Sequence, residues 1–413
     1  MGHPLLYEIN TRCWLNALSA QLQQPVTLGS IPESTFADWE RRGFTHIWLM
    51  GVWTTGPRAR EIALHEPGLV MNYDRVLPGW REEDVAGSPY SIAAYEVPAA
   101  LGGEAGFKTF REQLHERGMK LILDFVPNHL GIDHAWLAER PELFVQSAQE
   151  TEGTFAQPTA DGVRWIANGK DPYFAPWTDV AQVEYRRQSA RDAMRELLLD
   201  VAARCDGVRC DMAMLLLNEV FTRTWAHLPC AEKMPASEFW AGAITAVKRA
   251  QPGFIFMAEV YWGLEGTLQS LGFDYTYDKQ LYDDLIWRNY MGAQRRLLES
   301  SARFVESSVH FLENHDEDRA ATKFSHAELR AAALVILGLP GMRFLHEGQL
   351  EGAKLRVPVQ LGRWPVEPRD GEVAKIYESL LATLTRSAVG RGEFKLLLPR
   401  PAWYGNPTDH NFV

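Results

Sequence analysis

Short runs of hydrophobic residues alternate with amphipathic stretches along most of the chain. Eight runs have the length and apolar content of buried β-strands. Their near-continuous hydrophobicity is typical of a parallel sheet that is covered on both faces. The eight predicted strands are residues 5–10, 45–49, 120–125, 207–210, 254–258, 273–276, 308–312 and 342–345.

The stretches between these runs have the 3.6-residue period of amphipathic helices. In residues 104–117, Phe107, Phe110 and Leu114 share one face, and Gly118 stands where a helix commonly ends. Residues 189–204 show the same period. Eight alternating strand and helix units predict an α/β protein with a closed (β/α)8 barrel.

Two connections are too long to be simple turns. Residues 53–103 follow the second predicted strand, and residues 130–185 follow the third. Loops of this length in a compact protein are usually functional or form a subdomain. We therefore predict a barrel of residues 1–129 and 186–387, an inserted domain of residues 130–185, and a short, incomplete β-type domain of residues 388–413.

The composition is that of an ordinary globular protein, with 413 residues, 46% hydrophobic residues and 23% charged residues. The net charge of −11 argues against nucleic acid or an anionic membrane surface as a partner, because both attract basic faces. A neutral ligand such as a sugar is compatible with this charge. The 14 Trp and 13 Tyr residues could stack on sugar rings, although most are expected in the core.

Residues 1–10 lack a basic region followed by a long apolar run, so no signal peptide is expected. No stretch approaches the ~20 apolar residues of a membrane span. The four cysteines form no CxxC pair and are expected to be reduced, structural thiols of a cytoplasmic protein. They are Cys13, Cys205, Cys210 and Cys230.

Polar residues follow the carboxyl ends of several predicted strands, where barrel enzymes have their active sites. Asp211, Glu259 and Asp316 follow three different strands and are expected to converge on one pocket. Two carboxylates that flank a glycosidic bond can break it, one as nucleophile or base and one as proton donor. The four polar segments are Asp124-Phe125-Val126-Pro127-Asn128-His129, Gly207-Val208-Arg209-Cys210-Asp211, Ala258-Glu259-Val260 and Glu313-Asn314-His315-Asp316.

Each segment alone has an ordinary structural interpretation. An Asp at a strand end is usually a turn former or a helix cap. An Arg two residues before an Asp usually forms a local ion pair, and a His between Asn and Asp usually satisfies hydrogen bonds. The functional interpretation depends on all four segments occurring in order, each at the end of a separate strand.

In these four segments the chain resembles the α-amylase family, family 13 of the glycoside hydrolases. The order DxxxNH, GxRxD, E, NHD is that family's signature, and the resemblance covers about residues 5–385. It implies a (β/α)8 barrel, a domain B for the insertion and a fragment of a β-sandwich domain C for the tail. It also implies an enzyme that acts on α-linked oligosaccharides or polysaccharides with retention of configuration.

The resemblance assigns roles to eight residues of this chain. Asp211 would be the nucleophile, Glu259 the general acid and base, and Asp316 the third carboxylate, which grips ring hydroxyls. Four more would bind the substrate or support the nucleophile: Arg209 would keep Asp211 ionised, His129 and His315 would bind hydroxyls, and Tyr90 would stack beneath the sugar. Asp124 would support Arg209.

The chain also departs from the family pattern. Many α-amylases have Lys-His shortly after the nucleophile, which serves an acceptor subsite and a calcium site, but here Met214 and Leu215 follow. Asn128, another usual calcium ligand, is kept, whereas Asn10-Thr11-Arg12-Cys13 does not resemble the family's other calcium loop. No metal ion and no other cofactor are therefore expected. His346 and Glu347 could reach the site or form ion pairs, and Trp262 could line the acceptor side or pack in the core.

Four hypotheses remain open at the level of sequence. The first is an α-glucan or α-glucoside hydrolase, and the second is a transglycosylase or isomerase on the same scaffold. Apolar Met214 and Leu215 lean slightly toward transfer, because a water-poor acceptor site favours it. A non-catalytic sugar-binding protein is a weaker alternative. So is a metallo-enzyme that uses His129, His134 and the acidic stretch from Glu313 to Asp318. The oligomeric state is not indicated.

Overall fold

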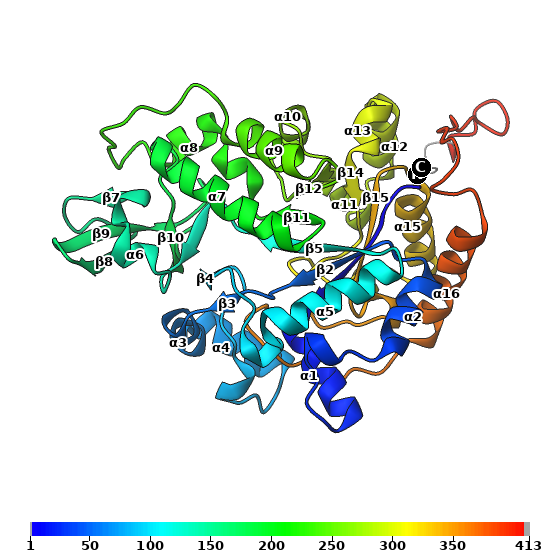
Figure 1. The fold of residues 1–413 in the computed structure, drawn as a ribbon. Coiled ribbons are helices and arrows are strands. Elements are labelled where there is room, and N and C mark those ends of the chain that lie inside the picture. Colours follow the sequence, from blue (N-terminus) through cyan, green and yellow to red (C-terminus); the bar gives the residue numbers. More distant parts are fainter. Residues whose placement is uncertain (1, 409–413) are drawn as a thin grey trace.

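The computed structural model describes residues 2–408, in which eight parallel strands close into one barrel (Figure 1). Consecutive strands are neighbours around the ring, and the last strand pairs with the first. The predicted barrel is confirmed, with strand ends that differ from the expected ones by one or two residues. The strands are β1 (Leu5–Asn10), β2 (His46–Met50), β5 (Lys120–Phe125), β11 (Gly207–Cys210), β12 (Ile255–Ala258), β13 (Tyr275–Tyr277), β14 (Ser308–His310) and β15 (Met342–His346).

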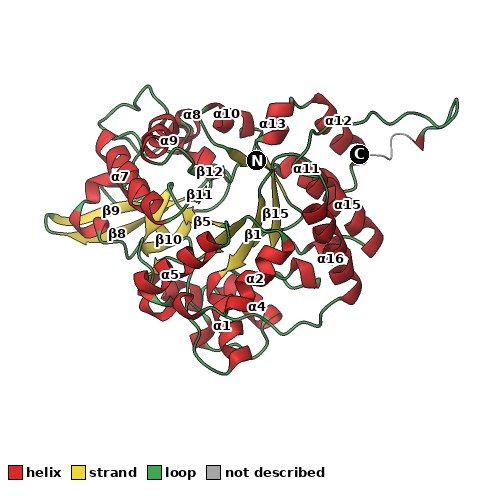
Figure 2. Cartoon of the chain, turned by 45° about the vertical axis from the view of Figure 1, so that its right-hand side comes forward, coloured by secondary structure: helices red, strands yellow, loops and turns green. Residues whose placement is uncertain are grey.

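Helices surround the barrel and cover the outer faces of its strands (Figures 1 and 2). The longer ones are α1 (Thr11–Leu22), α2 (Glu33–Arg42), α4 (Pro67–Val76), α5 (Gly103–Glu116), α7 (Gln188–Arg204), α9 (Phe239–Ala250), α12 (Tyr290–Glu299), α15 (His326–Gly338) and α16 (Gly371–Arg386). The shorter ones are α3 (Pro57–His65), α6 (Trp136–Glu139), α8 (Asn218–Thr224), α10 (Glu265–Ser270), α11 (Lys279–Ile286), α13 (Ala302–Glu306) and α14 (Ala320–Lys323).

Helix α5 shows how the sequence pattern becomes packing. Phe107, Phe110 and Leu114 are buried as their spacing predicts, and the Phe110 ring lies 6.1 Å from that of Trp14 on α1. Gly118 follows the helix with a φ of +68°, a conformation that glycine adopts without a steric penalty. The chain therefore turns after α5 and enters the barrel strand β5 at Lys120.

Alternate residues of β11 face the barrel interior, and this places Arg209 there. At Gly207, two residues earlier, a Cβ atom would lie 2.7 Å from the Ile255 carbonyl oxygen, so only glycine fits. Aromatic rings fill the interior layer below the arginine. The rings of Phe311 and Phe344 have centroids 5.7 Å apart. The guanidinium is thus held at the carboxyl end of the strand, on a packed hydrophobic floor.

Residues between β5 and β11 form a small antiparallel sheet beside the barrel, at the left of Figure 1. Its strands are β6 (His129–Gly131), β7 (Gln146–Ser147), β8 (Thr154–Thr159), β9 (Gly162–Gly169) and β10 (Trp177–Gln182). Strand β10 pairs with β6 directly after β5, so the sheet starts at the edge of the barrel mouth. The sheet lies between β5 and β11 in the chain, and the division into a barrel and an inserted domain of residues 130–185 stays a prediction.

The long connection after β2 contains α3, α4 and the two short strands β3 (Thr54–Thr55) and β4 (Ile92–Ala94). It encloses a second, smaller hydrophobic cluster that includes Tyr73 and Leu361. The Tyr73 and Trp80 rings lie 5.2 Å apart, edge to face. This packing fixes the segment that carries Tyr90.

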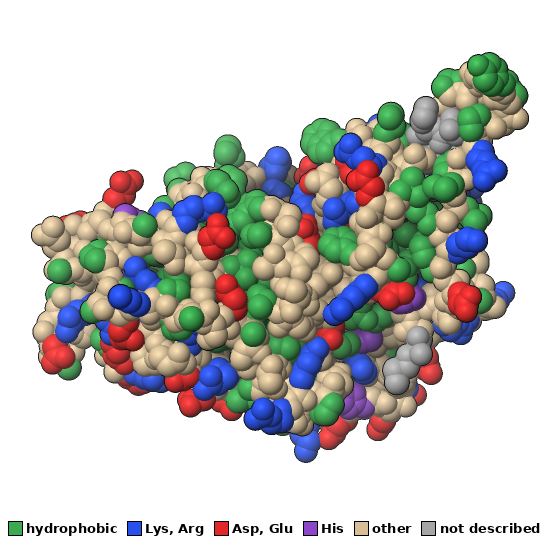
Figure 3. Space-filling model, turned by 90° about the horizontal axis from the view of Figure 1, so that it is seen from above, with side chains coloured by type: hydrophobic (Ala, Val, Ile, Leu, Met, Phe, Trp, Pro, Cys, Tyr) green, Lys and Arg blue, Asp and Glu red, His purple; other side chains and the backbone are tan. Residues whose placement is uncertain are grey.

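The expected β-type segment after residue 387 is wrong for residues 388–408, which contain turns and extended chain but no strand. The segment projects from the body (Figures 2 and 3), and Trp403 and Tyr404 are 69% and 105% exposed. The chain contacts the body near Gly390, whose carbonyl oxygen accepts from the His3 N–H at 2.6 Å, but within residues 388–408 this contact does not extend into the ladder of backbone hydrogen bonds that a strand needs. Residues 409–413 lie outside the described residues.

Candidate active site

Arg209 is the centre of a buried carboxylate cluster at the carboxyl end of the barrel. Its side chain is 1% exposed, and its Nη1 donates to Asp211 Oδ1 at 2.8 Å. Its Nη2 donates to Glu259 Oε2 at 2.6 Å. Asp124 Oδ1 lies 3.4 Å from Nη1, as expected for a carboxylate that supports the arginine. One guanidinium therefore holds carboxylates from three neighbouring strands.

The guanidinium also lies against aromatic faces. Its carbon is 5.4 Å from the ring centre of Trp48, 5.2 Å from that of Tyr90 and 6.0 Å from that of Tyr277. A cation over a ring face is attracted by the ring quadrupole, and more so away from water. Trp48 also donates from its indole nitrogen to Asp124 Oδ2 at 3.1 Å. The arginine therefore has little freedom to move away from the acids.

Both oxygens of Glu259 accept hydrogen bonds. Oε2 accepts from Arg209 and from the Met212 backbone N–H at 2.8 Å, and Oε1 accepts from the Tyr261 hydroxyl at 2.7 Å. Met212 has a φ of +44°, which is rare for a residue with a side chain. This left-handed backbone presents the Met212 N–H to the carboxylate, so local strain coincides with a contact at the site.

Burial determines the protonation of these acids. It raises the pKa of Asp211 and of Glu259, although the Arg209 cation opposes the change. It raises the pKa of Asp124 to about 7 against the same cation. Raised carboxyl pKa values in a cleft are typical of catalytic acids. The raised pKa of Glu259 favours its protonated form more than in water, as a proton donor needs.

Asp316 differs from the other acids. Its side chain is 49% exposed, and Oδ2 lies 2.9 Å from His315 Nε2. Although partial burial alone would raise the pKa of Asp316, the adjacent His315 lowers it to about 2. Asp316 therefore stays ionised under ordinary conditions and faces the cavity as an anion.

His315 joins several predicted site residues. The Tyr90 hydroxyl lies 2.8 Å from its Nε2, and the two rings are stacked with centroids 5.4 Å apart. Its Nδ1 bonds to Glu8 of β1. Burial alone would lower the pKa of His315, but Asp316 and Glu8 raise it well above the ordinary value. The predicted stacking residue Tyr90 thus also orients a histidine.

These side chains surround a cavity of about 270 Å³. His129 lies in its wall, and burial lowers the pKa of His129 to about 3, so this imidazole is neutral. A neutral imidazole can donate and accept hydrogen bonds with hydroxyls. The cavity lining is Ser88, Tyr90, His129, Trp177, Asp179, Val180, Asp211, Met212, Glu259, Asp316 and Gln360. Five of the seven predicted site residues thus line the cavity. The other two, His315 and Arg209, contact residues that line it.

Sequence reasoning missed four residues of this region. Trp177 and Asp179 reach the cavity from β10 of the inserted sheet, and burial raises the pKa of Asp179 to about 6. Nothing in the local sequence marks them. Tyr261 could have been considered because it is two residues from Glu259. Glu8 had a clear signal, a lone carboxylate within an otherwise apolar strand.

A larger cavity of about 550 Å³ lies next to the first one, and Met212 lines both. Its wall includes Tyr261, Trp262 and, from the insertion, Phe174. Trp262 is 40% exposed with a φ of +64°, so it lines the cavity and is not a core residue. The ring of Tyr173 lies 5.0 Å from that of Trp262, which brings the insertion and the barrel together beside Glu259.

Two sequence interpretations change with the structure. Met214 and Leu215 lie on a 3-10 turn, Ala213–Leu216, and are 0% and 3% exposed in the core, so they do not face the acceptor side. Met212 occupies that position. His346 does not line the cavity but forms an ion-pair network with Glu313 at 3.2 Å and Arg319. The sequence could not show where these side chains lie, because packing determines the path of the chain after β11 and β15.

The residues present do not fit the calcium site that the family resemblance suggested. Asn128 Oδ1 already accepts a hydrogen bond from Gln182 Nε2 at 3.0 Å, and Asn128 is 1% exposed. The position of the histidine that helps build that calcium site carries Leu215, which has no ligand atom. Within residues 2–408, no three His, Cys, Asp or Glu side chains are grouped so that they could hold a metal ion.

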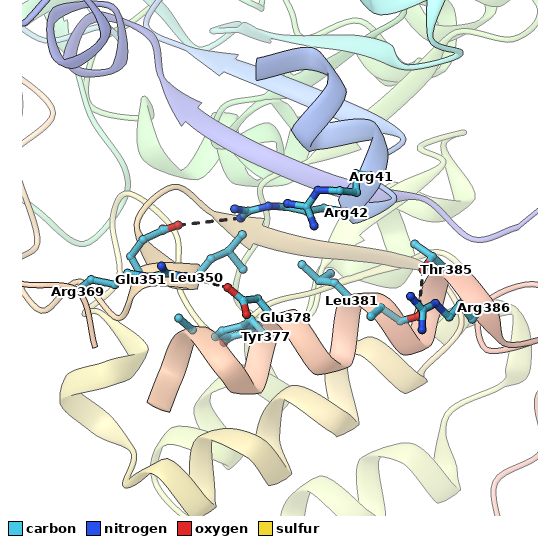
Figure 4. A pocket seen from close by; sticks show the side chains of 12 residues that line it. Arg41, Arg42, Leu350, Glu351, Arg369, Tyr377, Glu378, Leu381, Thr385 and Arg386 are labelled. Atoms are coloured by element: carbon cyan, nitrogen blue, oxygen red, sulfur yellow. Dashed lines mark hydrogen bonds and ion pairs between the residues drawn. The ribbon is translucent and has the colours of Figure 1, made fainter. Parts of the chain in front are cut away.

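A further cavity, of about 200 Å³, lies between α2 and α16 (Figure 4). Two of its arginines are paired with neighbouring carboxylates: Arg42 lies 2.8 Å from Asp38, and Arg369 lies 2.8 Å from Glu378. None of the predicted site residues lines this cavity. It is therefore separate from the carboxylate cluster.

Among the helices described, none is both long and apolar enough to cross a membrane. The four cysteines are free; three are buried and Cys230 is partly exposed.

The fold and the cluster together define a (β/α)8-barrel protein with a carboxylate site of the kind used in glycosidic chemistry. The family model of the α-amylase catalytic domain matches residues 43–355. The chain belongs to the α-amylase family.

Individual relatives are distant. "Alpha-amylase MalA" of Haloarcula japonica is 24% identical over 67% of this chain and 38% of its own length. "4-alpha-glucanotransferase" of Thermotoga maritima is 25% identical over 63% of this chain and 59% of its own length. The chain thus spans between about two fifths and three fifths of these relatives. The solved α-amylase from Lactobacillus plantarum has the same fold, with a TM-score of 0.67 and 21% identity over 96% of this chain and 83% of that one.

Proposed function

We propose that the protein cleaves or transfers α-glucosidic bonds of α-linked oligosaccharides or polysaccharides through a covalent glycosyl-enzyme intermediate. The single observation that supports this most strongly is the shared guanidinium, which holds Asp211 and Glu259 side by side at the cavity wall. Retaining enzymes need two carboxyl groups only about 5 Å apart. Two acids bound to adjacent nitrogens of one arginine support that close spacing.

In the first step, an Asp211 carboxylate oxygen attacks the anomeric carbon while the glycosidic C–O bond breaks. Glu259 gives its proton to the leaving oxygen. Because Glu259 Oε2 already accepts from two N–H groups, that proton belongs on Oε1, beside the Tyr261 hydroxyl. In the second step, Glu259 removes a proton from the incoming hydroxyl, whose oxygen displaces Asp211.

The remaining residues bind the sugar. Asp316, ionised and half-exposed, can accept from ring hydroxyls and stabilise the positive charge that develops at the anomeric centre. Neutral His129 can bind a neighbouring hydroxyl. Tyr90 offers a ring to the apolar face of the sugar, and Arg209 holds the nucleophile ionised.

A sugar acceptor instead of water is a second candidate, and a specific observation favours it. The adjoining cavity is lined by Phe174, Tyr261 and Trp262, which are suited to a second sugar ring. The glucanotransferase from Thermotoga maritima among the relatives agrees with this alternative. The four free cysteines further support a reducing, cytoplasmic location for either activity.

The test is incubation of the wild-type protein and the Asp211→Asn variant with maltose, maltotetraose, trehalose, sucrose and isomaltose. Proton NMR and chromatography would identify the products and the anomer released first. Longer oligomers or a new disaccharide without a net gain of reducing ends would indicate transfer or isomerisation. A net gain of reducing ends would indicate hydrolysis, and first release of the β-anomer would contradict the retaining mechanism.

A further inference from the structure

Glu8 is a buried carboxylate that no signature motif contains. It lies on β1, the first strand of the barrel, and is 0% exposed, so it cannot reach a substrate. One of its oxygens, Oε1, bonds to His315 Nδ1. The other, Oε2, has no hydrogen-bond partner within the described residues and lies 3.8 Å from His346 Nε2. Burying an under-satisfied carboxylate is costly, so a functional reason for it is expected.

Each nitrogen of His315 lies against a carboxylate, and this arrangement favours a proton on both nitrogens. Nδ1 faces the Glu8 carboxylate and Nε2 faces the Asp316 carboxylate at 2.9 Å. Carboxylates accept hydrogen bonds and do not donate them when ionised. A neutral imidazole would direct a lone pair at one of these two anions, and the repulsion would separate the pair.

We propose that Glu8 is a positioning residue that keeps His315 doubly protonated and thereby fixes Asp316, through His315, in its place at the cavity. The proposal rests on the function proposed above, since Asp316 acts on the sugar in that mechanism. The Tyr90 hydroxyl, 2.8 Å from His315 Nε2, is oriented by the same imidazolium. Glu8 thus acts on the reacting sugar only through two other side chains.

The surroundings of His315 explain why a separate carboxylate is needed. Burial removes the stabilising effect of water on a His315 cation, so the charge depends on the carboxylates of Asp316 and Glu8 that face it. The charged and titratable groups around the His315–Glu8 pair are Asp124 on β5, Arg209 and Asp211 at β11, Tyr90 before β4, Tyr277 on β13, Asp316 next in the chain, His346 on β15 and Glu347 after it.

The test compares pH profiles of kcat/KM for the wild-type protein, Glu8→Gln and Glu8→Asp on maltotetraose. Removal of an opposite charge in direct contact moves a pKa by about one to three pH units. We therefore expect the alkaline limb of Glu8→Gln to move to lower pH by at least about one unit. Glu8→Asp, which keeps the charge, should recover part of this change. A uniform loss of activity at every pH, with an unmoved limb, would overturn the proposal.

Glu347→Gln is the matched control. Its carboxyl accepts from the backbone N–H of Asn10 on the same strand β1 at 3.2 Å, but it does not contact His315. Burial raises the pKa of Glu347 to about 8, so the wild-type side chain is already neutral at pH 7. Because Glu347 ionises near pH 8 and interacts with Glu8, the control readout is the protonation of His315, which this variant should leave unchanged. A fall in the His315 pKa as large as in Glu8→Gln would overturn a specific role for Glu8.

A direct measurement separates this proposal from the proposed function. Imidazole nitrogen NMR of the wild-type protein, with His315 assigned by its absence in His315→Gln, reports both ring protons. The proposal expects His315 to stay doubly protonated well above the ordinary pKa of about 6.5. Titration at or below that value overturns it, whether or not Glu8→Gln folds. If no sugar is processed but His315 stays charged, the proposed function fails and the assignment of Glu8 stands.

Discussion

Two buried charge clusters lie at the same end of the barrel, and each is built on one arginine. In the first, Arg209 binds Asp211 and Glu259; in the second, Arg319 binds Glu313 at 2.7 Å. Burial raises the pKa of Asp211 and Glu259. The pKa of Glu313 is lowered despite burial, because Arg319 and His346 stabilise its charge.

The difference lies in how completely each carboxylate is satisfied. Glu313 accepts from Arg319 and from the Ala320 backbone N–H, both at 2.7 Å, His346 Nδ1 lies 3.2 Å from its Oε1, and Glu313 is 0% exposed. Asp211 has one close donor, Arg209, and its other side faces the cavity. A closed cluster stabilises the fold, whereas an open one keeps a carboxylate available for a reaction.

The strongest test of this comparison is removal of the nucleophile. Asp211→Asn should lower kcat/KM on maltotetraose by about 10⁴-fold or more, because no other described carboxylate of the cluster can replace it at the anomeric carbon. Steady-state kinetics measures this loss. The control is Asp192→Asn, a surface acid that pairs with Arg195 at 2.9 Å and should keep full activity. Substantial turnover by Asp211→Asn would place the nucleophile elsewhere.

Removal of the proton donor should have a somewhat smaller effect. Glu259→Gln should lower kcat/KM by about 10²- to 10⁴-fold on sugars whose leaving group needs a proton. With α-glucosyl fluoride, whose leaving group needs little protonation, the first step should recover. A release assay for fluoride measures this. Equal losses on both substrates would argue against the assignment of Glu259 as the acid.

A substitution in the second cluster should lower the stability of the protein and leave its catalytic activity unchanged. Glu313→Gln breaks a buried ion pair and should lower the free energy of unfolding by about 3 kcal/mol. Activity per folded molecule should stay near the wild-type value. Denaturant unfolding and active-site titration measure the two quantities, and a catalytic loss as large as that of Glu259→Gln would erase the distinction between the clusters.

The stability difference between the wild-type protein and Glu313→Gln should also depend on pH. Because the pKa of Glu313 is lower in the folded state, its contribution is present above the unfolded value of about 4.3 and is lost as pH falls through the folded pKa. The stability difference between wild type and Glu313→Gln should therefore shrink below about pH 4. A difference that is constant from pH 7 to pH 3 would contradict this.

The smallest effect is expected at Trp262, beside the open cluster. Trp262→Ala should raise KM for maltotetraose about two- to tenfold, because it removes a ring that can stack on a sugar. KM for a short aryl glucoside should change less. Trp262→Gly is the matched control for backbone strain, since glycine accepts the φ of +64° freely. Equal KM changes on both substrates would exclude a role on the acceptor side.

Much of the site could be predicted because its residues stand at strand ends. In a parallel barrel all strands end on one face, so Asp211, Glu259 and Asp316 had to approach one another. The barrel strands could be predicted approximately, because strands buried on both faces are nearly continuous apolar runs. Trp177 and Asp179 could not be found, because they reach the cavity from a separate sheet whose orientation no local pattern encodes.

The sequence by itself determined the barrel and the acids at its mouth, since strand periodicity and order leave few alternatives. Only the tertiary structure decided which charged groups are catalytic candidates and which are structural. Met214 and Leu215 turned into the core, His346 joined a closed ion-pair network, and Glu8 reached His315 from the other end of the chain. The physical reason is that hydrogen bonding and burial are properties of contacts between segments distant in sequence, and these contacts exist only once the barrel has closed.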